Sequence, residues 1–299
     1  MNELSLHVIG ALAALGSAFC WALSAILFHQ VGDKLSATGM NWWKGLVALL
    51  LLTILLLPDL PVFSLDEAYW RLAASGLLGI FIGDTLYFLA LTRLGARVTL
   101  LVGTMIPVVT AIGSVILFGD TLPLNAWLGL GLTLLGVTWV LWTQASTVSK
   151  VRQWRQGLFY GALFVLANAA AIIMTKQGVE SMDADAATWI RTFWAVFALG
   201  LFGTFTGRLL GWTQPLRSAQ LRKRLLAAAV IGALLGTWLS VVALKFTYAS
   251  VAAALNSTSP IFVLPLVVIF FRERIDFTAL FGAFLAVVGV GVYFASVFG

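Results

Sequence analysis

Apolar residues occur along this chain of 299 residues in long, nearly uninterrupted runs, and polar residues gather in the short stretches between them. A helix needs about 20 mainly apolar residues to cross the hydrocarbon core of a bilayer. Because the runs repeatedly reach that length, the pattern predicts ten membrane-spanning helices. Their expected ranges are 8–29, 40–57, 70–92, 97–118, 124–143, 157–176, 187–207, 225–246, 250–271 and 277–297.

The composition agrees with a chain surrounded by lipid. Hydrophobic residues make up 61% of it and charged residues 10%, whereas about a quarter of an ordinary soluble domain is charged. Polar groups are too few to cover a surface that faces water. The strands of a membrane β-barrel alternate apolar and polar residues, which these continuous runs do not. We therefore expect an all-α membrane protein.

The chain also contains an internal repeat. With a shift of 153 residues the last three spans of each half align without a gap, and with a shift of 147 the first two also match. Segments rich in Leu, Val and Gly can match through composition alone, but the shared register of proline, acidic residue and glycines argues against that explanation. The matching pairs include Gly83 with Gly236, Pro107 with Pro260, Asp120 with Glu273, Gly129 with Gly282, Gly136 with Gly289, Trp42 with Trp189, and Lys44 with Arg191.

This repeat predicts how the two halves are oriented. Residues 1–146 and 147–299 are expected to form two five-helix repeats. Because five is an odd number, the second repeat enters the membrane from the side opposite to the first. The halves would then be inverted repeats, related by a pseudo-two-fold axis in the membrane plane, as in many secondary transporters.

Lysine and arginine are distributed unevenly between the two sides of the expected bundle. They concentrate after the odd-numbered spans, above all in the linkers 144–156 and 208–224. Loops rich in Lys and Arg stay in the cytoplasm. We expect a multi-pass protein of the cytoplasmic (inner) membrane with both termini on the extracytoplasmic side. The N-terminal stretch lacks the basic segment of a cleaved signal peptide.

Several kinds of chemistry have no signature in the sequence. The net charge of +6 comes from short loops beside the membrane, so we expect no nucleic-acid partner. Cys20 is the one cysteine, no Cys/His cluster typical of a metal site occurs, and no ATP-binding Gly-rich motif is present. We expect neither a metal nor a cofactor. The expected partners are a small-molecule substrate, protons if Asp84 couples to them, and the lipid bilayer.

Several stretches resemble the EamA-type branch of the drug/metabolite transporter (DMT) superfamily. They are FCWALSAI in the first span, WWKG and its counterpart WIRT near the start of the second span of each half, and FGAFLAVVGVGVYF near the end. The resemblance covers essentially the whole chain, and Asp120 stands where the family usually has Glu in the acidic loop. It implies a polytopic carrier, often an exporter of metabolites such as amino acids.

Two stretches with a proline interrupt apolar spans at matching positions, LVGTMIPVVTAI and ALNSTSPIFVLP. A proline inside a helix frees a carbonyl, which needs a partner within the protein where lipid surrounds it. Thr104 in one stretch, and Asn256 with Ser257 in the other, are suited to this role and to lining a cavity. Pro107 and Pro260 are expected to act as hinges, and a static kink that helps packing is the alternative.

Asp84 lies well inside the expected third span, in GIFIGDTLYFLAL. A carboxylate at that depth costs about 2.5–3.5 kcal/mol on insertion scales, so it usually faces a cavity or a charged partner. We interpret Asp84 as a site for proton coupling or for a substrate amine. A helix cap or an ion pair with Lys44 is the alternative. Tyr87, three residues later, can share the same helix face.

Trp21 and Trp238 lie inside spans, away from the interfaces where tryptophan usually gathers. Together with Asn168, which takes the place of Trp21 in the second half, they are candidates to wall a substrate cavity. Packing between helices is the alternative. Lys44 and Arg191 are expected to anchor the chain at opposite interfaces by extending their charged ends to water.

These features favour a secondary active or facilitative transporter of small organic metabolites such as amino acids, expected to be an exporter, that works by alternating access of two inverted repeats around a midplane cavity. An intramembrane enzyme acting on lipids or peptides needs a nucleophile and base or an acidic pair. A channel usually has symmetric subunits or a repeated selectivity element. The sequence has neither pattern, so we expect no enzyme activity.

Overall fold

The computed structural model describes residues 3–32, 34–61, 63–118, 123–145, 151–213, 218–247, 249–256, 258–271 and 277–298. Every regular element within these ranges is helical, in agreement with the all-α prediction. In chain order they are α1 (Glu3–Val31), α2 (Ala37–Leu55), η1 (Leu57–Asp59), α3 (Glu67–Ser75), η2 (Gly76–Gly83), α4 (Asp84–Gly103), α5 (Ile106–Phe118), α6 (Leu124–Ala145), α7 (Val151–Val179), α8 (Ala184–Phe205), α9 (Leu209–Thr213), α10 (Ala219–Ala228), η4 (Ala229–Gly236), α11 (Thr237–Phe246), α12 (Ala249–Asn256), α13 (Ser259–Phe271) and α14 (Phe277–Phe298).

Within the described ranges, six helical segments are long and apolar enough to cross a membrane, and four shorter apolar helices accompany them. Within the described residues the predicted spans fall on helical segments, but their division differs. The spans 97–118 and 250–271 are each interrupted between two helices, and 70–92 and 225–246 each contain a π-helical segment. In addition, α4 joins the predicted third and fourth spans across a kink at Gly95, whose φ is 79°. Large apolar side chains such as Phe205 and Phe277 are more than three-quarters exposed, at 86% and 76%. A surface of this kind suits contact with acyl chains rather than water.

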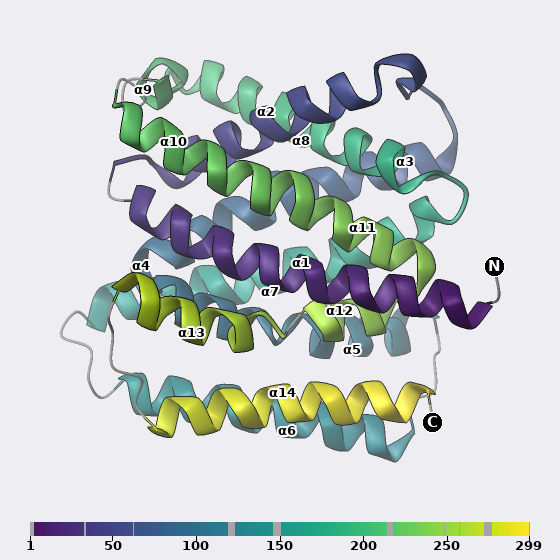
Figure 1. The fold of residues 1–299 in the computed structure, drawn as a ribbon, viewed down its shortest axis with the longest axis vertical. Helices are drawn as coiled ribbons and strands as arrows, with labels where there is room; N and C mark the ends of the chain where they lie inside the picture. Colours follow the sequence, from purple (N-terminus) through teal and green to yellow (C-terminus); the bar gives the residue numbers. More distant parts are fainter. Residues whose placement is uncertain are drawn as a thin grey trace.

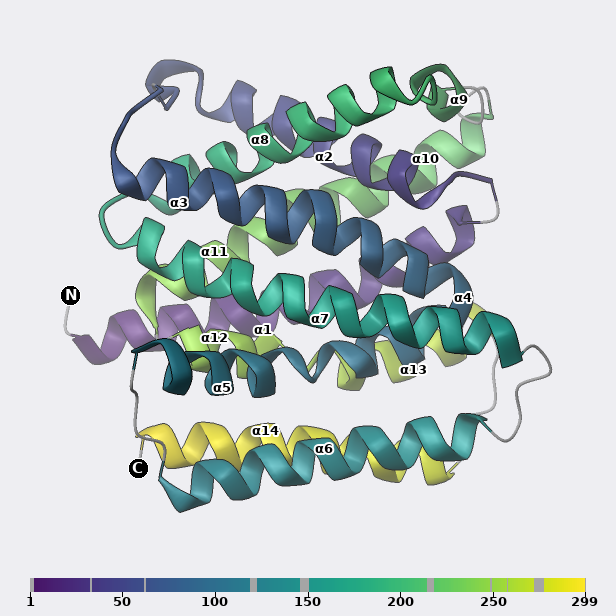
Figure 2. The same cartoon turned by 180° about the vertical axis from the view of Figure 1, so that it is seen from behind.

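The long helices lie side by side, with α1 and α7 running through the middle of the bundle (Figures 1 and 2). In both views α6 and α14 form a layer of their own at one edge. The two ends of the chain lie at the same end of the bundle, at the right in Figure 1.

The α6–α14 layer is held together by a reciprocal close contact. A Cβ atom on Gly136 would lie 2.4 Å from the backbone nitrogen of Ala286, and one on Gly289 would lie 2.4 Å from that of Thr133. The Thr133 hydroxyl donates to the carbonyl of Ala286 at 3.3 Å. Because Gly136 and Thr133 precede Gly289 and Ala286 by the same 153 residues, equivalent surfaces of the two halves face each other. Small residues permit this backbone approach between membrane helices.

The described part of each half contains one π-helical segment, at positions that also differ by 153 residues. These segments are η2 and η4. The backbone N–H of Asp84 bonds to the carbonyl of Gly79, and that of Thr237 bonds to the carbonyl of Gly232. Each bond spans five residues, as expected for a π-helix, a geometry often found at functional sites.

The first helix of each half packs on the π-helical segment of the other half. A Cβ on Gly236 of η4 would lie 2.8 Å from Cδ1 of Trp21, and one on Gly83 of η2 would lie 2.6 Å from Nδ2 of Asn168. Trp21 and Asn168 occupy matching positions in the repeat, as do Gly83 and Gly236. The two halves are therefore interleaved through equivalent contacts.

The predicted interruptions are present, and they too are equivalent. In the first half α4 ends at Gly103 and α5 begins at Ile106; in the second half α12 ends at Asn256 and α13 begins at Ser259. Each pair of bounds differs by the same 153 residues. Discontinuous helices at corresponding positions are typical of inverted-repeat transporters.

The prolines differ from the prediction in one respect. Pro107 and Pro260 lie in the first turn of the helix that follows each break, rather than inside a kinked helix. A first-turn residue needs no N–H donor and has the φ angle that proline supplies. At the first break the carbonyl of Leu101 accepts from both the hydroxyl and the backbone N–H of Thr104, at 2.7 Å and 3.0 Å. Pro107 is buried, and the side chain of Pro260 lies outside the described part.

Replacing Gly136 with alanine tests the close contact between α6 and α14. The new methyl group would collide with the backbone of α14, so the helices must separate, and we expect a loss of roughly 1–3 kcal/mol of stability. Gly131→Ala is the matched control on the same helix, because a Cβ there meets nothing within 4 Å. Thermal unfolding of the purified protein in detergent measures both. Equal midpoints for the two variants would show that the contact is not tight.

Candidate functional site

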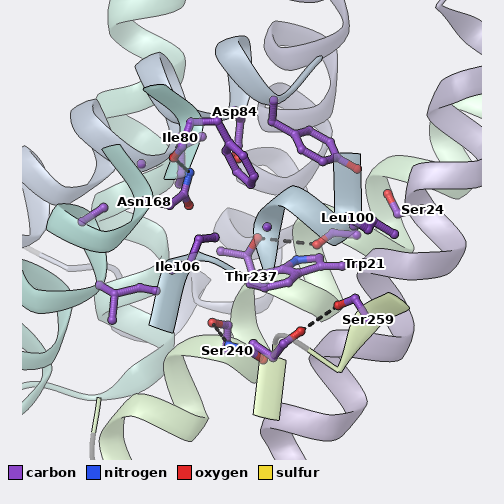
Figure 3. A pocket seen from close by; sticks show the side chains of 18 of the residues that line it. Trp21, Ser24, Ile80, Asp84, Leu100, Ile106, Asn168, Thr237, Ser240 and Ser259 are labelled. Carbon is purple, nitrogen blue, oxygen red and sulfur yellow. Dashed lines mark hydrogen bonds between the residues drawn. The ribbon is translucent and has the colours of Figure 1, made fainter. Parts of the chain in front are cut away.

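A cavity of about 140 Å³ lies between the two halves of the chain (Figure 3). Its walls come from α1, α2, η2, α4 and α5 of the first half and from α7, α8, η4, α11, α12 and α13 of the second. The volume is enough for several water molecules or a small solute. Both repeats therefore contribute to one cavity.

Both helix breaks open onto this cavity. Gly103 and Ile106 flank the break in the first half, and Asn256 and Ser259 flank the break in the second; all four line the cavity. Ser259 donates to the carbonyl of Asn256 at 2.7 Å. The second break therefore presents polar groups, whereas the first presents a glycine and an aliphatic side chain.

Five of the residues predicted to bind substrate or couple transport line the cavity. They are Trp21, Asp84, Tyr87, Asn168 and Asn256. They come from four helices that are far apart in the sequence, α1, α4, α7 and α12. The fold thus brings together positions that the sequence analysis selected separately.

The other predicted side chains lie elsewhere. Trp238 is not among the lining residues, and its indole N–H donates to the carboxylate of Asp185 at 2.5 Å. Its neighbour Thr237 lines the cavity instead. Thr104 is buried beside the first break without lining the cavity. Ser257 lies outside the described residues.

Asp84 forms an ion pair with Lys44 inside the cavity. Asp84 is the first residue of α4, where η2 ends, and the ammonium of Lys44 on α2 donates to its Oδ2 atom. The same ammonium lies 5.6 Å from the centroid of the Phe88 ring. Pairing with Lys44 was the alternative interpretation of Asp84. Because both residues line the cavity, the pair is also accessible to a bound solute.

The prediction that Lys44 and Arg191 anchor at opposite interfaces is wrong. Both line the cavity, and they are only 9% and 8% exposed. The carboxylate of Asp84 holds Lys44 in the interior, where an ion pair offsets part of the cost of desolvation. Arg191 is a charged site residue that sequence reasoning missed. Its alignment with Lys44 in the repeat was the signal that pointed to an equivalent interior position.

Glycines of η2 determine how close Arg191 comes to the centre. A Cβ on Gly76 would lie 2.2 Å from the carbonyl oxygen of Arg191, so only a glycine permits this approach of α8. A Cβ on Gly79 would lie 3.6 Å from Nη2 of Arg191. The guanidinium Nε has no hydrogen-bond partner in the described part of the chain.

The remaining walls combine apolar surface with a few hydrogen-bonding groups. The Asn256 amide donates to the Ser240 hydroxyl at 3.1 Å, while its Oδ1 has no partner among the described residues. Trp21 and Phe164 supply aromatic surface. Pockets for small molecules typically have this make-up, with mostly apolar walls and a few placed polar groups. The arrangement suits binding of a small solute that has both a charged and an apolar part.

Comparison with known proteins decides the family. Residues 8–142 and 155–295 match the EamA-like transporter family. The chain belongs to the EamA-like transporter family. The resemblance inferred from the short motifs is therefore confirmed over both halves. An uncharacterised transporter from Archaeoglobus fulgidus is 26% identical over 280 residues, which cover 93% of this chain and 95% of that protein.

A solved crystal structure supports the same fold for this EamA-like transporter. The two structures superpose with a TM-score of 0.72 at 14% sequence identity, over 97% of this chain and 96% of the other. At that identity the likeness concerns the fold alone. The family match and the apolar helices identify the chain as an integral membrane protein. Family and relative point to transport rather than to an intramembrane enzyme.

A double-mutant cycle on Lys44 and Asp84 tests the ion pair of this EamA-like transporter. Lys44→Met or Asp84→Asn alone leaves one buried charge without its partner, and we expect each to cost on the order of 3 kcal/mol of stability. The double variant removes both charges and is expected to recover most of that loss. Unfolding midpoints in detergent, at one pH and ionic strength, provide the cycle. Strictly additive losses would mean that the two side chains do not interact.

Proposed function

We propose that this EamA-like transporter moves a small organic metabolite, such as an amino acid, across the cytoplasmic (inner) membrane in the direction of export. The observation that carries the proposal is a single cavity to which both repeats contribute equivalent helix breaks. A site at the junction of two repeats is the arrangement that alternating access needs, because one repeat can move against the other around a fixed cargo.

The proposal includes ten membrane spans in two inverted five-helix repeats, residues 1–146 and 147–299. Three pairs of equivalent features support it: the π-helical segments, the helix breaks, and the contacts of α1 and α7 with the opposite half. The family also matches the chain in two consecutive parts. Reciprocal contacts are expected when a two-fold axis relates two copies of one unit.

The same equivalence suggests how the halves move. In the proposed mechanism the cavity opens first to one side and then to the other, as the two halves exchange equivalent conformations. The breaks after Gly103 and Asn256 give each half a point at which a helix can bend without losing hydrogen bonds along its whole length. Such discontinuities commonly provide both hinge and binding site in transporters.

We further propose that Asp84 couples transport to protons. It is the one carboxylate among the described residues that line the cavity, and its partner Lys44 lies in the same wall. Protonation of Asp84 would release Lys44 and change the charge of the cavity by one unit. A group that gains a proton on one side and loses it on the other can link the two fluxes.

Transport by reconstituted protein tests the proposal. Purified protein in proteoliposomes is expected to take up a member of an amino-acid panel with saturable kinetics and to show counterflow. Both properties distinguish a carrier from a channel, whose flux does not require a conformational cycle for each solute. Protein-free liposomes and an Arg93→Gln variant are the controls, since Arg93 donates to the carbonyl of Leu89 and does not line the cavity. Flux that neither saturates nor exchanges would overturn the proposal.

The Asp84→Asn variant tests proton coupling separately. An imposed pH gradient is expected to change the rate of the wild type several-fold and to leave the rate of the variant unchanged, because the amide cannot carry a proton. Uptake with and without the gradient, at equal external pH, is the measurement. A variant that keeps the full response would show that the proton acts elsewhere.

Labelling of terminal cysteines tests the proposed orientation. Cysteines placed at residues 2 and 299, in a Cys20→Ser background, are expected to react in intact cells with a thiol reagent that does not cross membranes. The uneven distribution of Lys and Arg is the physical reason. Reaction only after the cells are opened would place both termini in the cytoplasm and reverse the assignment.

A further inference from the structure

Arg191 brings into the cavity a charge without a carboxylate of its own, because Asp84, the acid that acts on it electrostatically, is already paired with Lys44. Arg191 is 8% exposed and lines the cavity, and its Nε atom has no hydrogen-bond partner among the described residues. Buried polar groups are normally hydrogen-bonded, and a buried charge is costly unless it is paired. An arginine that served packing alone would be expected to donate to carbonyl or carboxylate oxygens around it.

The repeat identifies what Arg191 lacks. Lys44 and Arg191 occupy matching positions, and Lys44 is paired with Asp84. The position that matches Asp84 in the second half is Thr237, which has no charge. The second half therefore keeps the cation of the pair and has no acid at the equivalent place. Among the described lining residues, two cations then share one carboxylate.

We propose that Arg191 binds a carboxylate of the transported molecule, which takes the place of the acid missing from the second half. This inference rests on the proposed transport function and defines its cargo as a small carboxylate with an apolar body. A guanidinium binds a carboxylate through two parallel hydrogen bonds, which fixes its orientation as well as its charge. One excess positive charge matches a carboxylate better than a phosphate, which carries −1.5 to −2.

The surrounding walls fit the rest of such a molecule. Trp21, Ile106 and Phe164 provide apolar surface for its body. The unpartnered Oδ1 of Asn256 can accept a hydrogen bond from an N–H or O–H group of the cargo. In this arrangement the carboxylate is recognised by Arg191, and the Asp84–Lys44 pair remains available to respond to protons.

Three compounds of one size separate the contributions of the two ends of the cargo. The probes are leucine, its amide (which lacks the carboxylate) and 4-methylpentanoate (which lacks the ammonium). Binding to the purified wild-type protein in detergent is measured by calorimetry. We expect both carboxylates to bind and the amide to bind roughly 10- to 100-fold more weakly, as for loss of a charged hydrogen-bonded pair. The ratio of leucine to 4-methylpentanoate tells whether the cargo is a zwitterion or a simple anion.

Variants of Arg191 identify the group responsible. Arg191→Gln is expected to lose the preference for carboxylate over amide. Arg191→Lys is expected to keep part of it, because lysine retains the positive charge but cannot donate the two parallel hydrogen bonds of a guanidinium. Arg93→Gln is the matched control and should bind as the wild type does. The empty Arg191→Gln protein is expected to unfold at an equal or higher temperature than the wild type, because it no longer buries a second cation beside a single carboxylate. A purely structural arginine would give a clear decrease.

Restoring the missing acid provides an independent test. Thr237→Asp is expected to give Arg191 an internal partner and to abolish the preference for carboxylates, whereas the uncharged Thr237→Asn should retain the ratio of carboxylate to amide. The ratio is informative even if both variants bind more weakly than the wild type.

The possible outcomes distinguish this inference from the proposed function. Binding of the amide as tightly as the acids, an unchanged ratio in Arg191→Gln, or no binding of any carboxylate by the wild type would overturn the inference. If saturable counterflow of an uncharged solute accompanies any of these results, the transport function stands and only the cargo assignment fails. If no solute in a broad panel shows saturable flux, the proposed function fails as well.

Discussion

Three charged side chains share one cavity inside an otherwise apolar bundle, and the need to compensate them governs the centre of the molecule. Lys44 is paired with Asp84, and Arg191 depends on the charge of that same carboxylate and has no acid of its own. Charges in such surroundings are retained only where partners or function offset the cost of desolvation. The walls that hold them are therefore the part of the bundle least suited to face lipid. That requirement places the cavity between the two halves.

The backbone geometry around the cavity follows from close packing by small residues. Gly76 lets α8 approach η2 so that Arg191 reaches the centre, and Gly83 and Gly236 make room for Asn168 and Trp21. Each of these glycines lies in or at the end of a π-helical segment. A wider helical turn shifts the side chains that follow it, including Asp84 at the start of α4. The π-helical backbone of η2 and the position of the Asp84–Lys44 pair therefore depend on each other.

Much of the fold was predictable, because apolar runs long enough to cross a bilayer are easy to recognise and the repeat restricts how they pair. Hydropathy predicts which residues lie within the membrane, but it does not predict which face of the helix each of them occupies. This explains the wrong predictions for the site. Trp238 and Thr237 are neighbours in sequence, yet only Thr237 lines the cavity. Arg191 was expected at an interface, since nothing local distinguishes an arginine that extends to water from one enclosed by glycines. The prolines marked the breaks correctly but begin the following helices rather than bending them.

In the proposed mechanism, the similarity of the two halves accounts for their movement, and the differences between them account for the chemistry of the cavity. Two identical repeats would give two conformations of equal energy that expose the same site to either side. The matching positions differ, with Thr237 in place of Asp84 and Asn168 in place of Trp21, and all four residues line the cavity. Under the proposed mechanism, the two conformations would therefore surround a cargo differently. A ligand or proton shifts an equilibrium only through such a difference in interaction. In the proposed carrier, an asymmetric set of charges within a repeated frame would give cargo and protons a reason to favour one of two states.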